Sequence, residues 1–415
     1  MDFDVVVVGG GLVGASFAVA LDQQFQNAGV RPLDVAVVEP FPMPESAENS
    51  EYQPSFDARS TAISWGARLI YEQLGLWSDI EKRATPIKHI HVSDRGHFGA
   101  TRLRAEDMRC EALGYVVENR WLGQLHLAGL RQSENVTFFC PASVKAVQQI
   151  VGGSRIIVDR GDTREELTAK LVVLSDGGRS GLRESLGIAC DSKEYDQFAL
   201  IANVATEKFH EYKAWERFTD EGPIAMLPLL DTGEGEHRCA LVWTLSTENT
   251  REVSQLTDED FLIRLQARFG FRLGRLLKVG SRFTYPLKLE ISKEQVRPGL
   301  VVVGNAAHTL HPVAGQGYNL ALRGALALSD VIRNAHQSVQ TGGGTTSIGE
   351  LSVLTRFKDW HQGDQFKTTQ LSDKLIQVFA SKQTNLIVAR DLGLLGLDIF
   401  GPAKKAFARQ AMGLG

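Results

Sequence analysis

The sequence predicts an α/β protein, in which a Rossmann-like domain with a parallel sheet carries an inserted mixed α+β domain and a C-terminal helical segment. Residues 3–40 show a strand-helix-strand pattern with a glycine-rich turn after the first strand. From about residue 195 to residue 285 the chain changes to short alternating stretches, which are typical of a mixed sheet. At Leu300 a β-branched strand, a turn and a helical pattern return, so the opening fold resumes after the insertion.

The first part of the chain supplies most elements of the Rossmann-like domain. The expected strands cover residues 3–8, 35–39, 136–139, 156–158 and 171–174, and the expected helices cover residues 13–25, 62–74 and 117–131. Residues 41–60 are rich in Pro, Ser and Glu and are expected to form a loop. Residues 86–104 alternate like a hairpin, with its turn at residues 94–96.

The inserted domain and the region after it have different patterns. Alternation predicts strands at residues 199–204, 238–245 and 281–287, and residues 258–269 have the periodicity of a helix. Residues 341–347 form a Gly- and Thr-rich link, and residues 349–411 are expected to be helical. The stretch from Leu371 to Val388 is expected to pack on the first domain, with a lipid-facing amphipathic helix as the alternative.

The turn after the first strand has the sequence of a dinucleotide-binding motif, Gly9-x-Gly11-x-x-Gly14. Gly9 would make the tight turn, Gly11 would admit a pyrophosphate, and Gly14 would let helix and strand pack closely. Glu39 ends the next strand and could accept hydrogen bonds from ribose hydroxyls, and its charge disfavours a 2′-phosphate there. A glycine-rich turn without a ligand is the alternative, but the complete strand-helix-strand-acid unit favours a dinucleotide.

Two shorter motifs are ambiguous by themselves. Asp176-Gly177 follows a buried strand, so it is either an ordinary turn or a segment beside the dinucleotide. Asp57-x-Arg59 precedes the helix expected at 62–74, so it is either a salt-bridged helix start or the source of an Arg that reaches the cofactor.

The run from Val301 to Leu320 is the most informative segment. It places a strand, a small-residue turn, a His-Pro pair and Gly-Gln-Gly before a helix, which brings backbone N–H groups to a polar ligand. His308 and His311 alone would more often be structural. Rigid Pro312 and the bare backbone at Gly315 and Gly317 suit a flat ring packed against the chain.

Composition narrows the functional class. The 415 residues carry a net charge of -4 without a basic stripe, so we expect no nucleic-acid partner. The four cysteines are far apart in sequence, which indicates thiols in a reducing compartment, and no metal site is expected. The first residues do not resemble a signal peptide, and no apolar stretch is long enough to span a bilayer. We therefore expect a cytoplasmic protein, with a peripheral position at the inner membrane as the alternative.

These motifs, in this order over most of the chain, resemble the FAD-dependent aromatic hydroxylases related to p-hydroxybenzoate hydroxylase. A narrower similarity points to the ubiquinone-biosynthesis branch, and within it to the 2-polyprenyl-6-methoxyphenol hydroxylases. The segments that carry it are residues 94–97, 112–118, 201–204, 216–219, 223–228 and 304–312. Asn305 departs from the wider family, which has an acid there, and an amide can still hydrogen-bond a ribityl hydroxyl but carries no charge.

The resemblance implies FAD as cofactor and a role for each motif. The cofactor-binding candidates are Gly9, Gly11, Gly14, Glu39, Arg59, Gln124, Asp176, Gly177, Asn305, Gly315, Gly317 and Asn319. Pro312 and Gln316 would frame the reactive face of the flavin. His311 is the nearest candidate for a base toward the substrate, with a structural role in the loop as the stronger alternative.

The implied domain boundaries follow from the same motifs. The FAD-binding domain would comprise residues 1–85, 109–190 and 285–340, the substrate domain a hairpin at 86–108 and residues 191–284, and the C-terminal helical segment residues 341–415. No second dinucleotide fingerprint is present, so the electron donor, NAD(P)H or a redox partner, stays open.

The implied reaction is hydroxylation of a polyprenylated phenol of the 2-polyprenyl-6-methoxyphenol type. In that family reduced FAD reacts with O₂ as cosubstrate to form a C4a-hydroperoxide, which delivers one oxygen atom to the ring. Other ubiquinone-biosynthesis proteins and a membrane surface are the partners that such a substrate suggests. The alternatives are a sibling hydroxylase of another ring position, an FAD-dependent isoprenoid reductase, and a non-catalytic FAD-binding subunit of a biosynthetic assembly.

Overall fold

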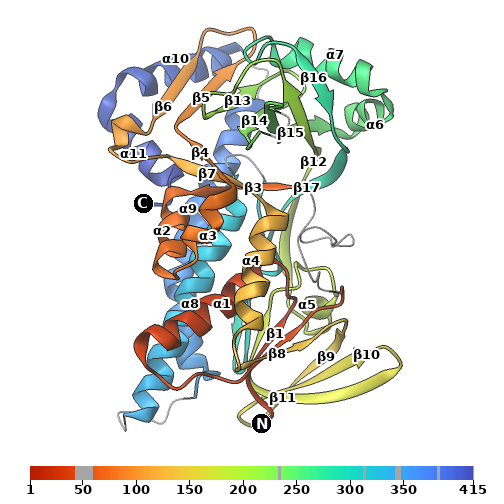
Figure 1. Ribbon diagram of the computed structural model, residues 1–415, viewed down its shortest axis with the longest axis vertical. Helices are drawn as coiled ribbons and strands as arrows, with labels where there is room; N and C mark the ends of the chain where they lie inside the picture. The colour runs from red at the N-terminus through yellow and green to blue at the C-terminus, as the bar shows by residue number, and fades with distance from the viewer. Residues whose placement is uncertain (43–58, 232–234, 312–314, 342–346, 381–383, 415) are drawn as a thin grey trace.

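A computed structural model describes residues 1–42, 59–231, 235–311, 315–341, 347–380 and 384–414. This part of the chain contains three sheets in an elongated molecule (Figure 1). An eight-stranded sheet lies at the lower end and a nine-stranded sheet at the upper end, with a three-stranded sheet between them. The prediction of a Rossmann-like α/β domain joined to a mixed α+β part is confirmed.

The eight-stranded sheet has a parallel core. Strands β8, β2, β1, β11 and β19 lie side by side and parallel. Parallel neighbours need a crossover connection, and helix α1 (Leu12–Ala28) provides the one from β1 to β2. The strands of this sheet are β1 (Phe3–Val8), β2 (Val35–Val38), β8 (Val136–Phe139), β9 (Ser143–Ile150), β10 (Gly153–Arg160), β11 (Thr163–Leu174), β18 (Val296–Arg297) and β19 (Leu300–Val302). Its central strands are continuous runs of buried Val and Leu, as expected for a sheet covered on both faces.

The nine-stranded sheet is mostly antiparallel and takes strands from distant parts of the sequence. They are β5 (His89–Asp94), β6 (Ala100–Arg104), β12 (Cys190–Thr206), β13 (Lys213–Phe218), β14 (Ile224–Pro228), β15 (Arg238–Ser246), β16 (Leu276–Val279), β17 (Phe283–Ser292) and β20 (His308–Thr309). The expected hairpin is β5–β6, and β5 pairs with β13, which joins the hairpin to the inserted strands. The proposed domain boundaries themselves stay predictions.

Two sequence predictions between the large sheets need correction. The helix expected at residues 62–74 begins only at α2 (Trp65–Gln73), because Ser60–Ser64 forms strand β3. The helix expected at 117–131 is α4 (Asn119–Arg131), because its first two residues end strand β7 (Gly114–Glu118). In both places the three-stranded sheet β3-β7-β4, with β4 at Ala84–Ile87, overrides the local helical periodicity.

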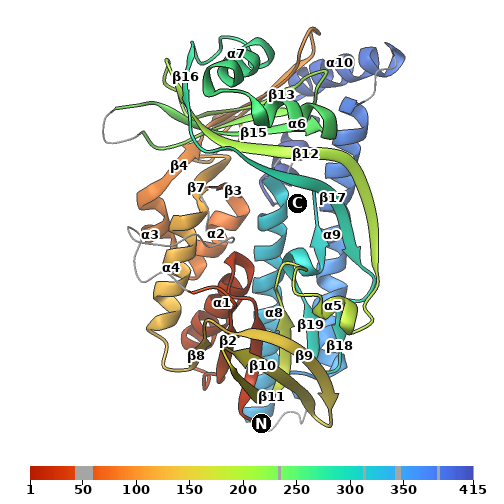
Figure 2. The same cartoon turned by 90° about the vertical axis from the view of Figure 1, so that its right-hand side faces the viewer.

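Two long helices connect the upper and lower parts of the molecule. Helices α8 (Gln316–Gln340) and α9 (Leu351–Ala380) lie side by side in both views (Figures 1 and 2), and Arg323 of α8 forms an ion pair with Asp364 of α9 at 2.7 Å. The remaining helices are α1 (Leu12–Ala28), α3 (Trp77–Ile80), α5 (Leu182–Ser185), α6 (Thr247–Gln255), α7 (Asp258–Phe269), α10 (Thr384–Ile399) and α11 (Gly401–Ala411). Residues 342–346 of the predicted link and residues 43–58 of the predicted loop lie outside the described residues.

Candidate functional site

The glycine-rich turn between β1 and α1 is packed so closely that a side chain has no room. Gly9 has a φ of 98°, and a Cβ there would lie 2.9 Å from the Cα of Asp176. A Cβ on Gly14 would overlap the carbonyl oxygen of Gly9 and lie 2.6 Å from the Oγ of Ser175. The Ser175 hydroxyl contacts the carbonyl oxygens of Val8 and Gly9, each at 2.9 Å. The first and second sequence motifs are therefore in direct contact.

The first turn of α1 is open to an anionic ligand. Gly11 is its N-cap residue, and this helix start has neither a side-chain cap nor an acidic side chain. The first N–H groups of a helix have no partner within it, so they and the positive end of the helix dipole favour a phosphate. Glu39 lies beside this turn, where its Oε2 accepts a hydrogen bond from the N–H of Gly10 at 2.7 Å.

The Asp-Gly motif and the late turn form the next part of the site. Asp176 accepts hydrogen bonds within its own loop, from the N–H of Gly178 at 2.9 Å, and nothing lies within 4 Å of where a Cβ of Gly177 would be. The Gly178 position faces the carbonyl oxygen of Asn305 at 3.7 Å. Asn305 is exposed, so its amide is accessible to a ligand at the carboxyl end of β19.

Enclosed polar atoms without a partner indicate that α4 and β3 face a ligand. The amide nitrogen of Gln124, the Nε of Arg120 and the Oγ of Ser60 are enclosed and have no hydrogen-bond partner among the described residues. Burying such groups unpaired costs about 1–3 kcal/mol each, which a bound polar molecule removes. Arg59 stands near them and stacks on the ring of Tyr285 at 4.8 Å, while Asp57 lies outside the described residues.

The loop before α8 is fixed by one asparagine. The Oδ1 of Asn319 accepts from the N–H of Ser64, and its Nδ2 donates to the carbonyl oxygens of Ala62 and Gly315, all at 2.8 Å. Its amide thus ties the loop to β3. A Cβ on Gly317 would meet nothing within 4 Å, which leaves open space at the start of α8. The direct cofactor contacts of these residues stay predictions.

The structure gives the three catalytic candidates different surroundings. Gln316 is buried and donates a hydrogen bond to the carbonyl oxygen of Ala411. The next two residues, 412 and 413, pack against Gly66. His311 is buried edge-on against Tyr195, and burial lowers its pKa to about 4. Pro312 lies outside the described residues. Their catalytic roles stay predictions.

Two features of the site have no motif in the sequence. The contact of residues 411–413 with the loop joins segments almost 100 residues apart, and only tertiary packing creates it. The enclosed Arg120 and Ser60 stand among ordinary helix and strand residues. Only the folded structure, in which the neighbouring elements surround these side chains, reveals that their polar atoms lack hydrogen-bond partners among the described residues.

The buried histidines predict loss of stability in mild acid. Burial lowers the pKa of His308 to about 3 and that of His361 to about 4, with His311 also at about 4. Their folded-state pKa lies below that of the unfolded chain, so the unfolded state binds more protons from pH 6.5 down to about pH 4, and stability falls with pH across that window. Each should cost about 2 kcal/mol between pH 7 and pH 5.

Thermal unfolding at a series of pH values measures this effect. The melting temperature should fall steeply below pH 6, and His361→Gln should make that dependence shallower. Identical pH dependence in wild type and variant would contradict the contribution assigned to His361.

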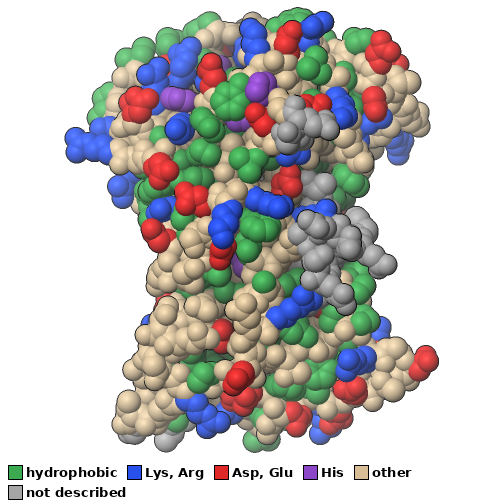
Figure 3. Space-filling model, in the orientation of Figure 1, with side chains coloured by type: hydrophobic (Ala, Val, Ile, Leu, Met, Phe, Trp, Pro, Cys, Tyr) green, Lys and Arg blue, Asp and Glu red, His purple; other side chains and the backbone are tan. Residues whose placement is uncertain are grey.

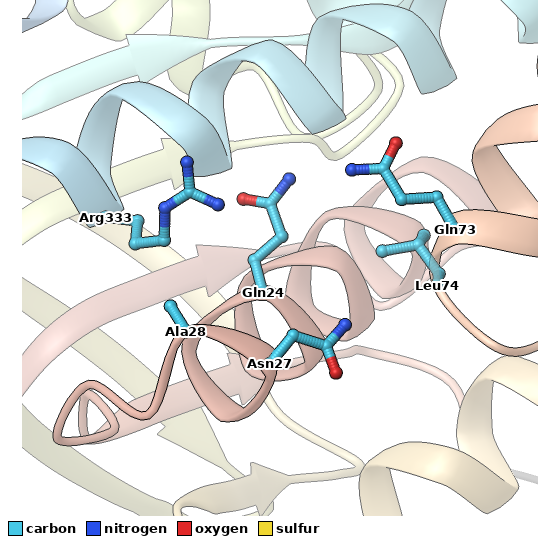
Figure 4. A pocket seen from close by; sticks show the side chains of 6 residues that line it. All are labelled: Gln24, Asn27, Ala28, Gln73, Leu74 and Arg333. Carbon is cyan, nitrogen blue, oxygen red and sulfur yellow. The ribbon is translucent and has the colours of Figure 1, made fainter.

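A cavity of about 150 Å³ lies away from these motifs (Figure 4). Its lining residues come from the end of α1, from the end of α2 with the residue after it, and from α8, and they are Gln24, Asn27, Ala28, Gln73, Leu74 and Arg333. The glycine motif is at the other end of α1, roughly 20 Å away along a helix that rises about 1.5 Å per residue. This cavity is therefore separate from the candidate site.

Comparison with known proteins gives a family that fits this geometry. A family model described as an FAD binding domain matches residues 2–337. The chain belongs to this FAD-binding family. It is 33% identical to the ubiquinone hydroxylase UbiL of Rhodospirillum rubrum, over 99% of the chain and 89% of that protein. It is 29% identical to 3-demethoxyubiquinol 3-hydroxylase of Escherichia coli, over 99% and 98% of the two chains.

A solved structure supports the fold. The p-nitrophenol 4-monooxygenase PnpA of Pseudomonas putida superposes with a TM-score of 0.74 at 19% identity, covering 99% of this chain and 98% of that one. The predicted assignment to FAD-dependent aromatic hydroxylases of the ubiquinone branch is confirmed, and with it the predicted monooxygenase class, FAD and O₂.

The residues present fit FAD. The tight turn at Gly9 and Gly14 and the uncapped start of α1 would hold the pyrophosphate, and Glu39 beside that turn would hold ribose hydroxyls. The enclosed amide of Gln124 is a further polar group that FAD could satisfy. In the described ranges no cluster of three or more metal-ligating side chains occurs. None of the helices described is long and apolar enough to cross a bilayer.

Proposed function

We propose that this FAD-dependent monooxygenase hydroxylates the ring of a polyprenylated phenol of the 2-polyprenyl-6-methoxyphenol type in ubiquinone biosynthesis. The relatives named ubiquinone hydroxylases support the pathway. The observation that supports the substrate most directly is an apolar, partly exposed face of the nine-stranded sheet, which we call the inner face. Its residues belong to β5, β13, β14, β15 and β12.

The two faces of this sheet differ in burial. The outer face is covered by α6 and α7, and residues such as Trp243, Met226 and Leu241 are fully buried there. The inner face contains a cross-strand row in which Val92, Ala225, Val242 and Ile201 are all partly exposed. Apolar side chains left partly accessible inside a protein of this size indicate a surface for an apolar ligand.

Contacts link the inner face to the loop before α8. Ala214 of β13 and Leu227 of β14 pack in one apolar cluster with Ala62 of β3. A Cβ on Gly315 would in turn lie 3.2 Å from the Cβ of Ala62. A ring that lies on the inner face would thus be next to the loop that the family resemblance assigns to the flavin.

The chain's own residues would bind, orient and shield the reactants. FAD, when bound, supplies the activation of O₂. Asn319 fixes the loop, the inner face orients the ring, and the apolar side chains around it exclude water. The reductant is proposed to be NAD(P)H or a redox partner.

An exposed apolar patch at the edge of the same sheet suits the polyprenyl tail. Leu392, Leu395 and Ile399 form one exposed face of α10, and Phe400 follows them. Phe98 is also exposed, on the β5–β6 turn that contacts α10 through Gly99. Leu394, on the opposite face, packs against Gly99. Hydrophobic and basic side chains are intermixed along the upper left edge in Figure 3, over α10 and α11. We infer that this apolar patch contacts the membrane from which the substrate comes.

Replacing Phe98 and Ile399 with Ser should weaken membrane binding at least tenfold, since two large apolar side chains leave the lipid phase at about 1.5–3 kcal/mol each. Co-sedimentation with vesicles of phosphatidylethanolamine and phosphatidylglycerol measures it. Val151→Ser, at an exposed turn between β9 and β10, is the control. Equal binding of the double variant and the control would contradict a role of the patch in membrane contact.

Isotopic labelling tests the proposed function. The protein should restore ubiquinone in a strain that lacks the corresponding hydroxylase, and growth under labelled O₂ should place one labelled oxygen atom on the ring. Consumption of NAD(P)H without labelled product would favour an isoprenoid reductase. Accumulation of the polyprenyl-methoxyphenol despite abundant protein would exclude the proposal, and the position of the label would distinguish sibling hydroxylases.

A further inference from the structure

A lone carboxylate stands in the apolar row of the inner face. Glu216 of β13 pairs with Ala225 of β14 and with Val92 of β5, and Ala225 pairs with Val242 of β15. Side chains opposite one another in a sheet lie on the same face, so Glu216 belongs to this row. It makes no hydrogen bond or ion pair with any of the described residues. Nothing in the fold of the sheet requires a carboxylate there.

The surroundings of Glu216 place it at an interior surface. Part of the side chain is accessible, yet it is so enclosed by protein that burial raises its pKa to about 7. Its oxygens are also absent from the enclosed, partnerless polar atoms of the described residues. A carboxylate at an outer surface would be fully hydrated, whereas one in a closed core would need a partner. Glu216 therefore borders the space that we assign to the substrate ring.

Glu216 is also close to the loop before α8. Ala214 lies two residues earlier on the same strand, and it packs in the cluster that includes Ala62. Same-face neighbours on a strand are about 6.6–6.8 Å apart. A ring between Glu216 and the loop that contains Gly315 would thus touch both.

We propose that Glu216 is the base that accepts the phenol proton of the substrate, an inference that rests on the proposed function. The proton passes from the phenol oxygen to the Glu216 carboxylate, and the oxygen's electron pair activates the ring carbon. That carbon would bond to one oxygen atom of O₂ while the bond between the two oxygen atoms breaks; the other atom would leave as water, with the two electrons supplied by reduced FAD. When that carbon releases its own hydrogen as a proton to solvent, the ring oxygen takes the proton back from Glu216. Glu216 thereby returns to the carboxylate form.

Glu216 suits this step better than the other groups near the loop. Proton transfer is most efficient when the pKa of the base is near the operating pH, and a carboxylate with pKa about 7 meets this condition. His311, with a pKa of about 4, is a much weaker base toward a phenol. Other described charged groups at this face are engaged elsewhere: Asp94 with Arg390, Arg59 with Tyr285, Arg238 with Glu118, and His97 beside Asp391.

Ionisation of a bound phenol tests the proposal without turnover. The probe is 2-methoxyphenol with one five-carbon prenyl group at position 6, added to the oxidised, FAD-loaded enzyme without reductant. Ultraviolet difference spectra between pH 6 and pH 10 report the phenolate. In wild type the phenol binds beside the ionised Glu216 carboxylate, and a nearby negative charge disfavours a phenolate, so the bound phenol should ionise at least one pH unit higher than in Glu216→Gln. Glu216→Gln should still bind the probe, but its turnover at pH 7 should fall at least tenfold and recover as the pH approaches that at which the phenol ionises without a base.

Controls separate this role from structural effects. Glu211→Gln makes the same substitution at an exposed position just before β13 and should behave as wild type. Glu216→Asp keeps a carboxylate and should retain part of the pKa shift of the bound phenol. Ionisation in Glu216→Gln at the wild-type pH, or loss of FAD from this equally sized variant, would overturn the proposal. If wild type itself fails to bind the probe, the proposed function fails as well.

Discussion

Gly14→Ala should abolish FAD binding while leaving the rest of the chain folded. The added methyl group would overlap the carbonyl oxygen of Gly9 and lie 2.6 Å from the Oγ of Ser175. Neither neighbour can move freely, because Ser175 contacts the carbonyl oxygens of Val8 and Gly9. Overpacking of this kind costs about 1–3 kcal/mol. The turn can relieve the clash only by opening, and opening displaces the N–H groups that would face the pyrophosphate. Since about 1.4 kcal/mol is a factor of ten, the overpacking alone lowers the affinity for FAD by roughly 5- to 150-fold, and the displaced N–H groups add to this loss.

A second glycine provides the matched control for this prediction. Gly129 is also inside a helix, α4, and a Cβ there would meet nothing within 4 Å. Gly129→Ala should therefore retain FAD and gain up to about 1 kcal/mol in stability from helix propensity. Flavin absorbance per protein after gel filtration, together with circular dichroism, measures both variants. A yellow, fully loaded Gly14→Ala protein would refute the assignment of this turn to the cofactor.

The local sequence pattern was sufficient to predict the helices and strands that have a strong hydrophobic periodicity. Strand β1 and helix α7 begin and end at the predicted residues. Strand β1 is a short hydrophobic run that ends at a glycine turn, and α7 has a regular amphipathic pattern that also ends at a glycine. Residues 62–64 and 117–118 were predicted wrongly as helix, because their pairing with a strand distant in sequence decides their conformation. Sequence periodicity reports the local preference for helix or strand. It does not show which distant strand a segment will pair with.

The candidate site shows the same division between local and distant information. The glycine turn and Asp176-Gly177 are motifs whose chemistry can be read from adjacent residues, and the structure brings them into contact. Glu216 was included in the sequence comparison only as part of a segment. Its isolation on an apolar face depends on the registers of β5, β14 and β15, which lie far from it in sequence.

Asn319→Leu should lower the free energy of unfolding by at least about 3 kcal/mol and release FAD. The substitution removes the partner of the Ser64 N–H and the partners of two carbonyl oxygens, those of Ala62 and Gly315. Each buried backbone group left unpaired costs about 1–3 kcal/mol, and leucine of similar size fills the space without satisfying any of them. Because Asn319 joins β3 to the loop before α8, the loop should lose its position as well as its stability.

Two further variants distinguish lost hydrogen bonds from lost packing. Asn319→Asp keeps an acceptor for the Ser64 N–H but turns an oxygen toward two carbonyl oxygens, so it should be nearly as damaging above pH 6. Asn334→Leu makes the same change at an exposed position of α8 and should leave stability within about 0.5 kcal/mol of wild type. Denaturant unfolding followed by flavin fluorescence measures stability and cofactor release together. Wild-type stability of Asn319→Leu would show that this asparagine does not hold the flavin-side loop against β3.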